Sequence, residues 1–196
     1  MAYDLSILNG NNGFVINGIP QRDWISNPSF FPTSEGNPND FVSGAGDING
    51  DGIDDLIIGS SNTNPNGQID AGQSYVVFGS NQGFDASLEI SNLNGSNGFV
   101  INGIDEKDYS GHSVSGAGDI NGDGIDDLII GAPRGPEEMT GSGESYVVFG
   151  SNQGFDASLD LANLNGSNGF VINGINPGDR AGYSVSRAGD VNGDGF

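Results

Sequence analysis

The chain has 196 residues, and 26 aspartates and glutamates against five lysines and arginines give it a formal net charge of −21 at pH 7. So acidic a chain cannot neutralise a run of phosphates, which argues against nucleic-acid binding. No apolar stretch approaches the roughly 18 residues of a membrane span. The absence of cysteine excludes a disulfide scaffold, a cysteine zinc site and a thiol nucleophile.

The first predicted strand, at residues 13–18, lies in the motif Asn-Gly-Phe-Val-Ile-Asn-Gly-Ile, which starts at Asn12 and recurs from Asn97 and Asn168. Aromatic and β-branched residues between glycines are typical of short strands. An insertion follows this first copy and holds Trp24, Phe30 and Phe31. We expect its aromatic rings either to fold back onto the domain or to bind a sugar or a partner protein.

A longer motif then repeats along the chain. The sequence Gly-Asp-Ile-Asn-Gly-Asp-Gly-Ile-Asp-Asp-Leu-Ile-Ile-Gly occurs identically at residues 46–59 and 118–131, and a third copy starts at Gly189. Its leading aspartates, Asp47, Asp119 and Asp190, are 72 and then 71 residues apart. A fixed period of this kind indicates stacked or radially arranged units, not one unrepeated enzyme domain.

Within the second unit, four short β-rich runs predict four strands, and one helical turn is expected within residues 158–164. The runs are residues 113–115, 128–130, 146–149 and 170–172. Four short strands per unit are typical of a propeller blade, whereas a sandwich gives no reason for exact repetition and a β-helix needs a shorter period. We therefore predict an all-β fold, a β-propeller of four-stranded antiparallel blades. The arc is incomplete, with two full blades, an N-terminal outer strand and a C-terminal inner strand at residues 183–189.

The repeated motif carries oxygen-bearing side chains at positions 1, 3, 5 and 9 of a tight loop, with glycine at position 6. Three carboxylates, an amide and an inward backbone carbonyl are ligands for a hard cation, and their number favours Ca²⁺ over Mg²⁺. The predicted ligands are Asp47, Asn49, Asp51, the Ile53 carbonyl and Asp55 in the first loop, Asp119, Asn121, Asp123, the Ile125 carbonyl and Asp127 in the second, and Asp190, Asn192 and Asp194 in the third.

The third loop lacks position 9, so we expect it to bind calcium weakly. Asp54 and Asp126 are expected to point away from the ion. An EF-hand would need a glutamate at position 12, where Ile58 stands, and flanking helices, whereas this loop leads into a strand. The remaining alternative is an aspartate-rich and asparagine-rich turn with solvated carboxylates and no metal.

These motifs together resemble the FG-GAP repeat, which builds the β-propeller of integrin α subunits and many bacterial surface proteins. The resemblance rests on residues 110–114, on the loop, and on Leu-Ile-Ile-Gly-Ala-Pro at residues 128–133, and it covers nearly all of the chain outside residues 20–39. It implies calcium loops between the first two strands of each blade and an N-terminal strand that completes the last blade. Gly111-His112 and Gly182-Tyr183 depart from the Phe-Gly of the family, as does Gly59-Ser60 from its Gly-Ala-Pro.

We accordingly divide the chain into five parts. These are residues 1–19, an outer strand completing the last blade; 20–40, the insertion loop; 41–103, the first blade; 104–174, the second blade; and 175–196, the start of a third. Unpaired strand edges bind other strands readily. We therefore expect the open edges to be covered by remaining blades of the same protein or by neighbouring chains.

The predicted function is a calcium-binding module of a surface or adhesion protein, extracellular or at the cell surface, although Met1–Asp4 shows no signal peptide. Its ligand, a protein or a carbohydrate, is left open. Two alternatives are a carbohydrate-binding or hydrolase-associated propeller and a structural assembly subunit.

No enzymatic activity is predicted. The single histidine, His112, precedes Ser113, but no second histidine exists for a triad, so His112 is expected to be a packed ring. The pair Glu137-Glu138 is expected to lie in a solvated loop.

Overall fold

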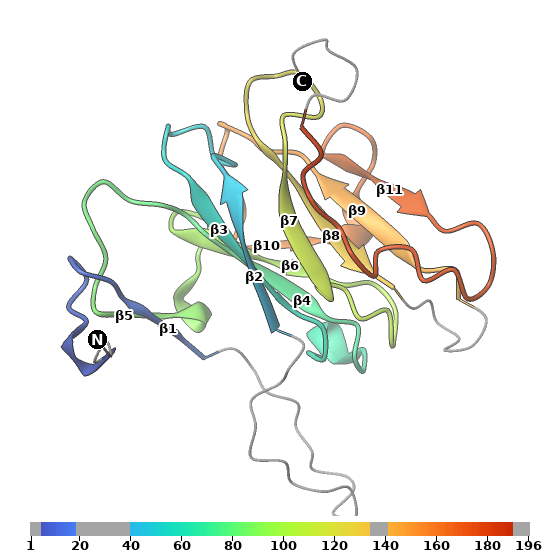
Figure 1. The fold of residues 1–196 in the computed structure, drawn as a ribbon, viewed down its shortest axis with the longest axis horizontal. Helices are drawn as coiled ribbons and strands as arrows, with labels where there is room; N and C mark the ends of the chain where they lie inside the picture. The colour runs from blue at the N-terminus through green and yellow to red at the C-terminus, as the bar shows by residue number, and fades with distance from the viewer. Residues whose placement is uncertain (1–4, 19–39, 134–140, 190–196) are drawn as a thin grey trace, which may run out of the picture.

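The computed structural model describes residues 5–18, 40–133 and 141–189 (Figure 1). These residues form short β-strands and single 3-10 turns, without any α-helix, and none of their helical turns is long and apolar enough to cross a membrane. The strands are β1 (Val15–Asn17), β2 (Asp40–Gly46), β3 (Asp55–Ser60), β4 (Gln73–Val77), β5 (Ser87–Glu89), β6 (Gly98–Asn102), β7 (Ser113–Gly118), β8 (Asp127–Ala132), β9 (Glu144–Val148), β10 (Ser158–Asp160) and β11 (Gly169–Asn173). The turns are η1 (Leu5–Ile7), η2 (Pro65–Gly67), η3 (Ile90–Asn92) and η4 (Leu161–Asn163).

Two antiparallel sheets with the same topology form the body of the molecule. The first has the order β2-β3-β4-β6 and the second β7-β8-β9-β11, so each follows the sequence as a meander. Their inner strands, β2 and β7, lie side by side near the centre of Figure 1. The predicted all-β fold with propeller-type blades in an open arc is therefore confirmed.

Glycines on the inner strands allow this close approach. A β-carbon on Gly116 would lie 2.7 Å from the Ala45 carbonyl oxygen, a distance that no side chain could occupy without moving the backbone. The hydrophobic core fills the space between the two sheets. It includes Ile57, Val76 and Phe99 from the first sheet and Leu128 and Ile130 from the second.

Two three-residue strands were not predicted. β5 pairs in parallel with β1, and β10 pairs in parallel with β6, so each joins a strand of the preceding unit. The predicted helical turn within residues 158–164 is present as η4, but Ser158–Asp160 before it is β10. A run of three residues carries no hydrophobic period, and its partner strand lies in another unit, so the local sequence could not indicate it.

The predicted inner strand at residues 183–189 is absent from the described part of the chain. Just before that segment Ala181 forms a bridge with Gly143, and within it the Val185 N–H donates a 3.0 Å hydrogen bond to the Ser113 Oγ. An inner strand is stabilised by the second strand of its own blade, and the described residues include none. The predicted outer strand at residues 13–18 is present as β1. Of the predicted insertion, residues 20–40, all but residue 40 lies outside the described residues, and the domain boundaries stay a prediction.

A buried carboxylate lies in the connection from β6 to β7. Asp108 accepts a 3.0 Å hydrogen bond from the Asp105 N–H, and Glu144, which accepts the Tyr146 hydroxyl, is a nearby negative charge. Burial raises the pKa of Asp108 to about 7 despite the Asp105 N–H, and the charges of Asp105 and Glu144 add to the rise. The folded protein therefore binds the Asp108 proton more tightly than the unfolded chain does.

Packing between the two units can be tested with two phenylalanines at the same repeat position. Phe99 is fully buried and stacks on Phe155 with ring centroids 4.3 Å apart, whereas Phe170 is 37% exposed. Phe99→Ala should lower the free energy of unfolding by about 3–5 kcal/mol, because it opens a cavity in the core. Phe170→Ala should cost about 1–2 kcal/mol, because less apolar area leaves the interior. Urea unfolding of both variants checks this, and equal losses would contradict it.

The raised pKa of Asp108 predicts a pH dependence. Between pH 4 and 7 the native state holds an Asp108 proton that the unfolded chain has released, so the contribution of Asp108 to stability should fall by up to about 1.4 kcal/mol per pH unit as the pH rises. Asp108→Asn is neutral and can still accept the Asp105 N–H, so it should flatten this part of the profile and melt higher than the unsubstituted chain at pH 8. Melting curves from pH 4 to 8 measure the difference, and parallel profiles would refute it.

Candidate functional site

The two described carboxylate loops join the first two strands of each sheet. Residues 47–54 connect β2 to β3, and residues 119–126 connect β7 to β8, so the aspartate at position 9 is the first residue of the second strand in both blades. Gly52 and Gly124, at position 6, have φ values of +88° and +90°, which favour glycine. The predicted sharp turn at position 6 is thus present twice.

In the first loop, three side chains fold over the backbone of the turn. The Asp47 Oδ1 and the Asn49 Oδ1 both accept the Asp51 N–H at 2.9 Å, and the Asp47 Oδ2 accepts the Gly52 N–H at 2.8 Å. The Asp51 Oδ1 in turn accepts the Ile53 N–H at 2.9 Å. The loop thereby brings the predicted ligands at positions 1, 3 and 5 together around one turn.

The aspartate at position 9 anchors the loop to the sheet. Asp55 is buried, and its two oxygens accept the Ile48 N–H at 3.0 Å and the Gly79 N–H at 2.7 Å. Burial raises the pKa of Asp55 to about 6, while these two hydrogen bonds lower it and the charges of Asp51 and Asp47 raise it further. The negative charge of Asp55 is therefore costly in the fold as it stands.

The second loop repeats this arrangement. The Asp119 carboxylate accepts the N–H groups of Gly122, Asp123 and Gly124 at 2.7–3.1 Å, and the Asn121 Oδ1 also accepts the Asp123 N–H. Buried Asp127 accepts the N–H groups of Ile120 and Gly150 at 2.8 and 2.9 Å, and burial raises its pKa. Both copies of the motif thus impose one loop conformation.

The predicted ligand atoms of each loop are of the kind that a hard cation binds. Every predicted ligand atom is an oxygen, and a carboxylate oxygen that accepts one N–H keeps a lone pair for a second partner. In the structure side-chain oxygens at positions 1, 3 and 5 accept N–H groups of their own loop, and one oxygen each of Asp55 and Asp127 accepts the N–H of Gly79 or Gly150 outside it. The described residues hold no group of three or more histidines, cysteines, aspartates or glutamates placed to bind a metal ion. Metal binding by the two loops therefore stays a prediction, and the third loop, residues 190–194, lies outside the described residues.

Asp126 has a role that the sequence did not reveal. Its Oδ2 accepts the Asp47 N–H at 3.0 Å, and its own N–H donates to the Asp47 carbonyl at 3.2 Å. It also lies 3.8 Å from the Arg187 guanidinium. Asp126 points away from its own loop, as predicted, but toward the loop of the preceding unit, whereas Asp54 at the same position is exposed. The two loops are hence linked directly.

His112 is a packed ring, as predicted. It lies between Phe41 and Tyr183, with ring centroids 5.7 and 4.8 Å away. The aromatic residues of the insertion, Trp24, Phe30 and Phe31, and the pair Glu137-Glu138 lie outside the described residues, so those predictions stay open.

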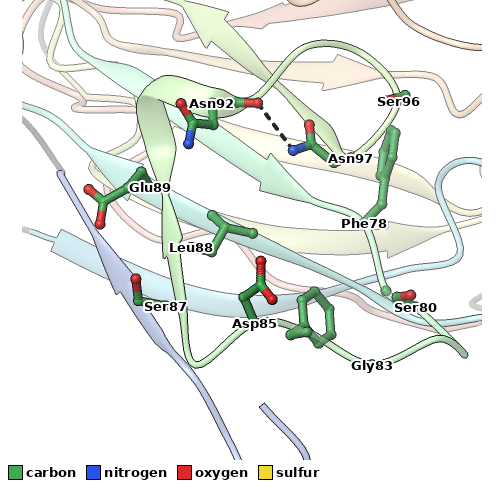
Figure 2. Close-up of a pocket in the computed structure, with 12 residues that line it drawn as sticks. Phe78, Ser80, Gly83, Asp85, Ser87, Leu88, Glu89, Asn92, Ser96 and Asn97 are labelled. Atoms are coloured by element: carbon green, nitrogen blue, oxygen red, sulfur yellow. Dashed lines mark hydrogen bonds between the residues drawn. The ribbon is translucent and has the colours of Figure 1, made fainter. Parts of the chain in front are cut away.

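A pocket recurs at the same position in both units. The first, of about 360 Å³, has Asp85 and Leu88 near its centre, with Asn92 and Asn97 across from them (Figure 2). The second, of about 590 Å³, is lined by the residues 71 positions further along the chain. They include Asp156, Leu159, Asn163 and Asn168. Each pocket therefore combines a carboxylate and amides with an apolar wall.

Comparison with known proteins agrees with the repeat structure. The FG-GAP repeat family model matches residues 41–77 and 110–148, which contain the first three strands of each sheet. Phosphatidylinositol-glycan-specific phospholipase D of Bos taurus is 34% identical over 109 residues, covering 55% of this chain and 13% of that protein. Integrin alpha-PS2 of Drosophila melanogaster is 32% identical over 113 residues, 55% of this chain and 7% of the integrin.

A longer match is Integrin alpha-PS5 of Drosophila melanogaster, 30% identical over 161 residues, which is 78% of this chain and 13% of the integrin. The chain thus spans 13% or less of the length of these relatives. Because the two family matches fall on the first three strands of the two blades, the chain contains two FG-GAP repeats and is an integrin-like β-propeller module.

Proposed function

We propose that this module binds Ca²⁺ through the loops between the first two strands of each blade, and that the ions stabilise a surface or adhesion protein. The observation that carries the proposal is the buried aspartate at position 9. Asp55 and Asp127 are buried carboxylates, and no lysine or arginine among the described residues forms an ion pair with either. A cation beside each would offset the cost of burying its charge.

Each ion would take ligands from one loop alone. The first would be held by Asp47, Asn49, Asp51, the Ile53 carbonyl and Asp55, and the second by the equivalent five residues, Asp119, Asn121, Asp123, the Ile125 carbonyl and Asp127. The N–H bonds already orient most of these side chains over the turn, so little ordering would be needed on binding. Bound calcium would supply positive charge to a chain with a formal net charge of −21 and would reduce the repulsion among its carboxylates.

The proposed surface role rests on similarity to integrins. The phospholipase D relatives are named as enzymes, but the match covers 13% of the bovine protein, and we propose that this module is not itself an enzyme.

Calcium removal should destabilise the fold. Binding to the native state adds about 2.7 kcal/mol per site at a hundredfold excess over Kd, so EGTA should lower the melting temperature measured in calcium. Asp55→Asn should remove about half of this difference. Asp54→Asn changes the same charge at an exposed neighbour outside the ligand set and should leave the difference intact.

Comparing each variant with and without calcium is needed because Asp55→Asn also disturbs the bonds to Ile48 and Gly79, which act in both conditions. Differential scanning calorimetry of the three proteins provides the measurement. Identical melting curves for the unsubstituted chain in calcium and in EGTA would rule out the proposal.

The repeated pocket favours a second candidate, carbohydrate binding. Carboxylates and amides beside an apolar wall are the groups that recognise sugar hydroxyls and ring faces. If the pockets bind a glycan, titration should give two sites per chain, and Asp85→Ala or Asp156→Ala should each remove one. A glycan array without any binding would eliminate this candidate.

A further inference from the structure

Three buried serine hydroxyls lie where the first unit meets the second, and we call this group, Ser61, Ser74 and Ser110, the serine corner. Each of the three residues is at most 1% exposed. The Oγ atom of each is buried and has no hydrogen-bond partner among the described residues. A buried hydroxyl without a partner has lost the hydrogen bonds that water gives it in the unfolded chain. Such groups are rare in folded proteins and call for a bound water or ion.

The backbone of Ser110-Gly111, just before β7, crosses the first sheet at this corner. A β-carbon on Gly59 would lie 2.1 Å from the Gly111 carbonyl oxygen, and one on Gly72 would lie 2.0 Å from the Ser110 carbonyl oxygen. The Ser110 N–H also donates to the Ala71 carbonyl at 2.9 Å. The segment therefore rests directly on β3 and on the residue before β4.

Ser61 and Ser74 flank this segment. Ser74 pairs with Gly59 in the register of β3 and β4, and its Oγ lies 3.0 Å from the β-carbon position of Gly111. Ser61 comes two residues after Gly59, and residues two apart in an extended chain point to the same side. The three hydroxyls thus surround one segment of backbone, yet none of them is hydrogen-bonded to another.

The second unit shows that this backbone arrangement does not require the hydroxyls. β-carbons on Gly131 and Gly143 would lie 1.9 Å from the Gly182 carbonyl oxygen and 2.4 Å from the Ala181 carbonyl oxygen, so the same crossing is present there. At the repeat positions of Ser61 and Ser110, however, the second unit has Pro133 and Ala181. The serine corner is therefore a feature of the first unit and not of the repeat.

We propose that the serine corner binds ordered water, which bridges the Ser110 hydroxyl to the hydroxyls of Ser61 and Ser74. A water molecule both donates and accepts, so it can take the proton of one hydroxyl and give a proton to the lone pair of the next. A cation would bind only the lone pairs and would leave each O–H without an acceptor. The corner lies beyond the end of β3 opposite to the carboxylate loop, so this water does not depend on calcium binding.

A high-resolution crystal structure of the full, unsubstituted chain tests the proposal directly. It should show a water oxygen within about 2.5–3.2 Å of the Ser110 Oγ and of at least one of the other two hydroxyls. Ser110→Ala introduces the residue that stands at the same position in the second unit, and its crystal structure should have lost this water.

Oxygen-17 magnetic relaxation dispersion tests the same point in solution, because it counts internal water molecules that exchange slowly. The triple variant Ser61→Ala/Ser74→Ala/Ser110→Ala should hold fewer of them than the unsubstituted chain. The control variant Ser87→Ala/Ser158→Ala removes hydroxyls from exposed serines of β5 and β10 and should leave the count unchanged.

Three outcomes would overturn the proposal. The first is a crystal structure in which the serine hydroxyls bond directly to protein atoms and no water lies within reach of them. The second is an occupant with about six or more oxygen ligands at 2.3–2.6 Å, because the corner would then bind a cation. The third is a count of internal waters that falls equally in the triple and control variants or in neither.

Discussion

Burial of the first blade's outer strand, β6, by the second unit is the contact on which the structure depends. A four-stranded sheet cannot bury both of its faces by itself, and the repeat solves this by stacking. Phe99 and Phe170 are the same residue at the same position, yet the first is fully buried and the second is 37% exposed. The difference is the ring of Phe155 from the following unit, which stacks on Phe99. Stability in this chain is therefore a property of neighbouring pairs of units, as in other repeat proteins.

Burial of apolar side chains supplies the free energy that stabilises the contact between units, but it does not determine the register in which their strands pair. The short parallel ladders, the Asn102–Asp160 and Asn17–Glu89 hydrogen bonds and the stacked rings are directional. A one-residue slip would turn the side chains of β10 to the wrong face and separate the amide from its carboxylate. Polar pairs of this kind select one alignment among many that would bury a similar area.

The carboxylate loops are connected to the same contact. Asp126 bonds to the backbone of Asp47 in the preceding unit, and the Ile48 carbonyl beside it accepts the Ser151 N–H. A change in the conformation of one loop would therefore alter the hydrogen bonds between units as well as those of its own turn. If calcium orders the loops as proposed, it stabilises the arc through these bonds in addition to reducing repulsion among carboxylates.

The sequence by itself determined the features that are local to one unit. The repeat period, the four strands of each blade, the glycine at position 6 and the aspartates of the loops all follow from patterns a few residues long. Only the tertiary structure decided what joins one unit to another. β5 and β10 are too short to carry a period, Asp126 reaches a backbone N–H 79 positions earlier, and residues 183–189 do not form the predicted strand. A segment with strand propensity forms a strand only where the edge of another strand lies beside it. That edge is supplied by the folded neighbouring unit and not by the local sequence.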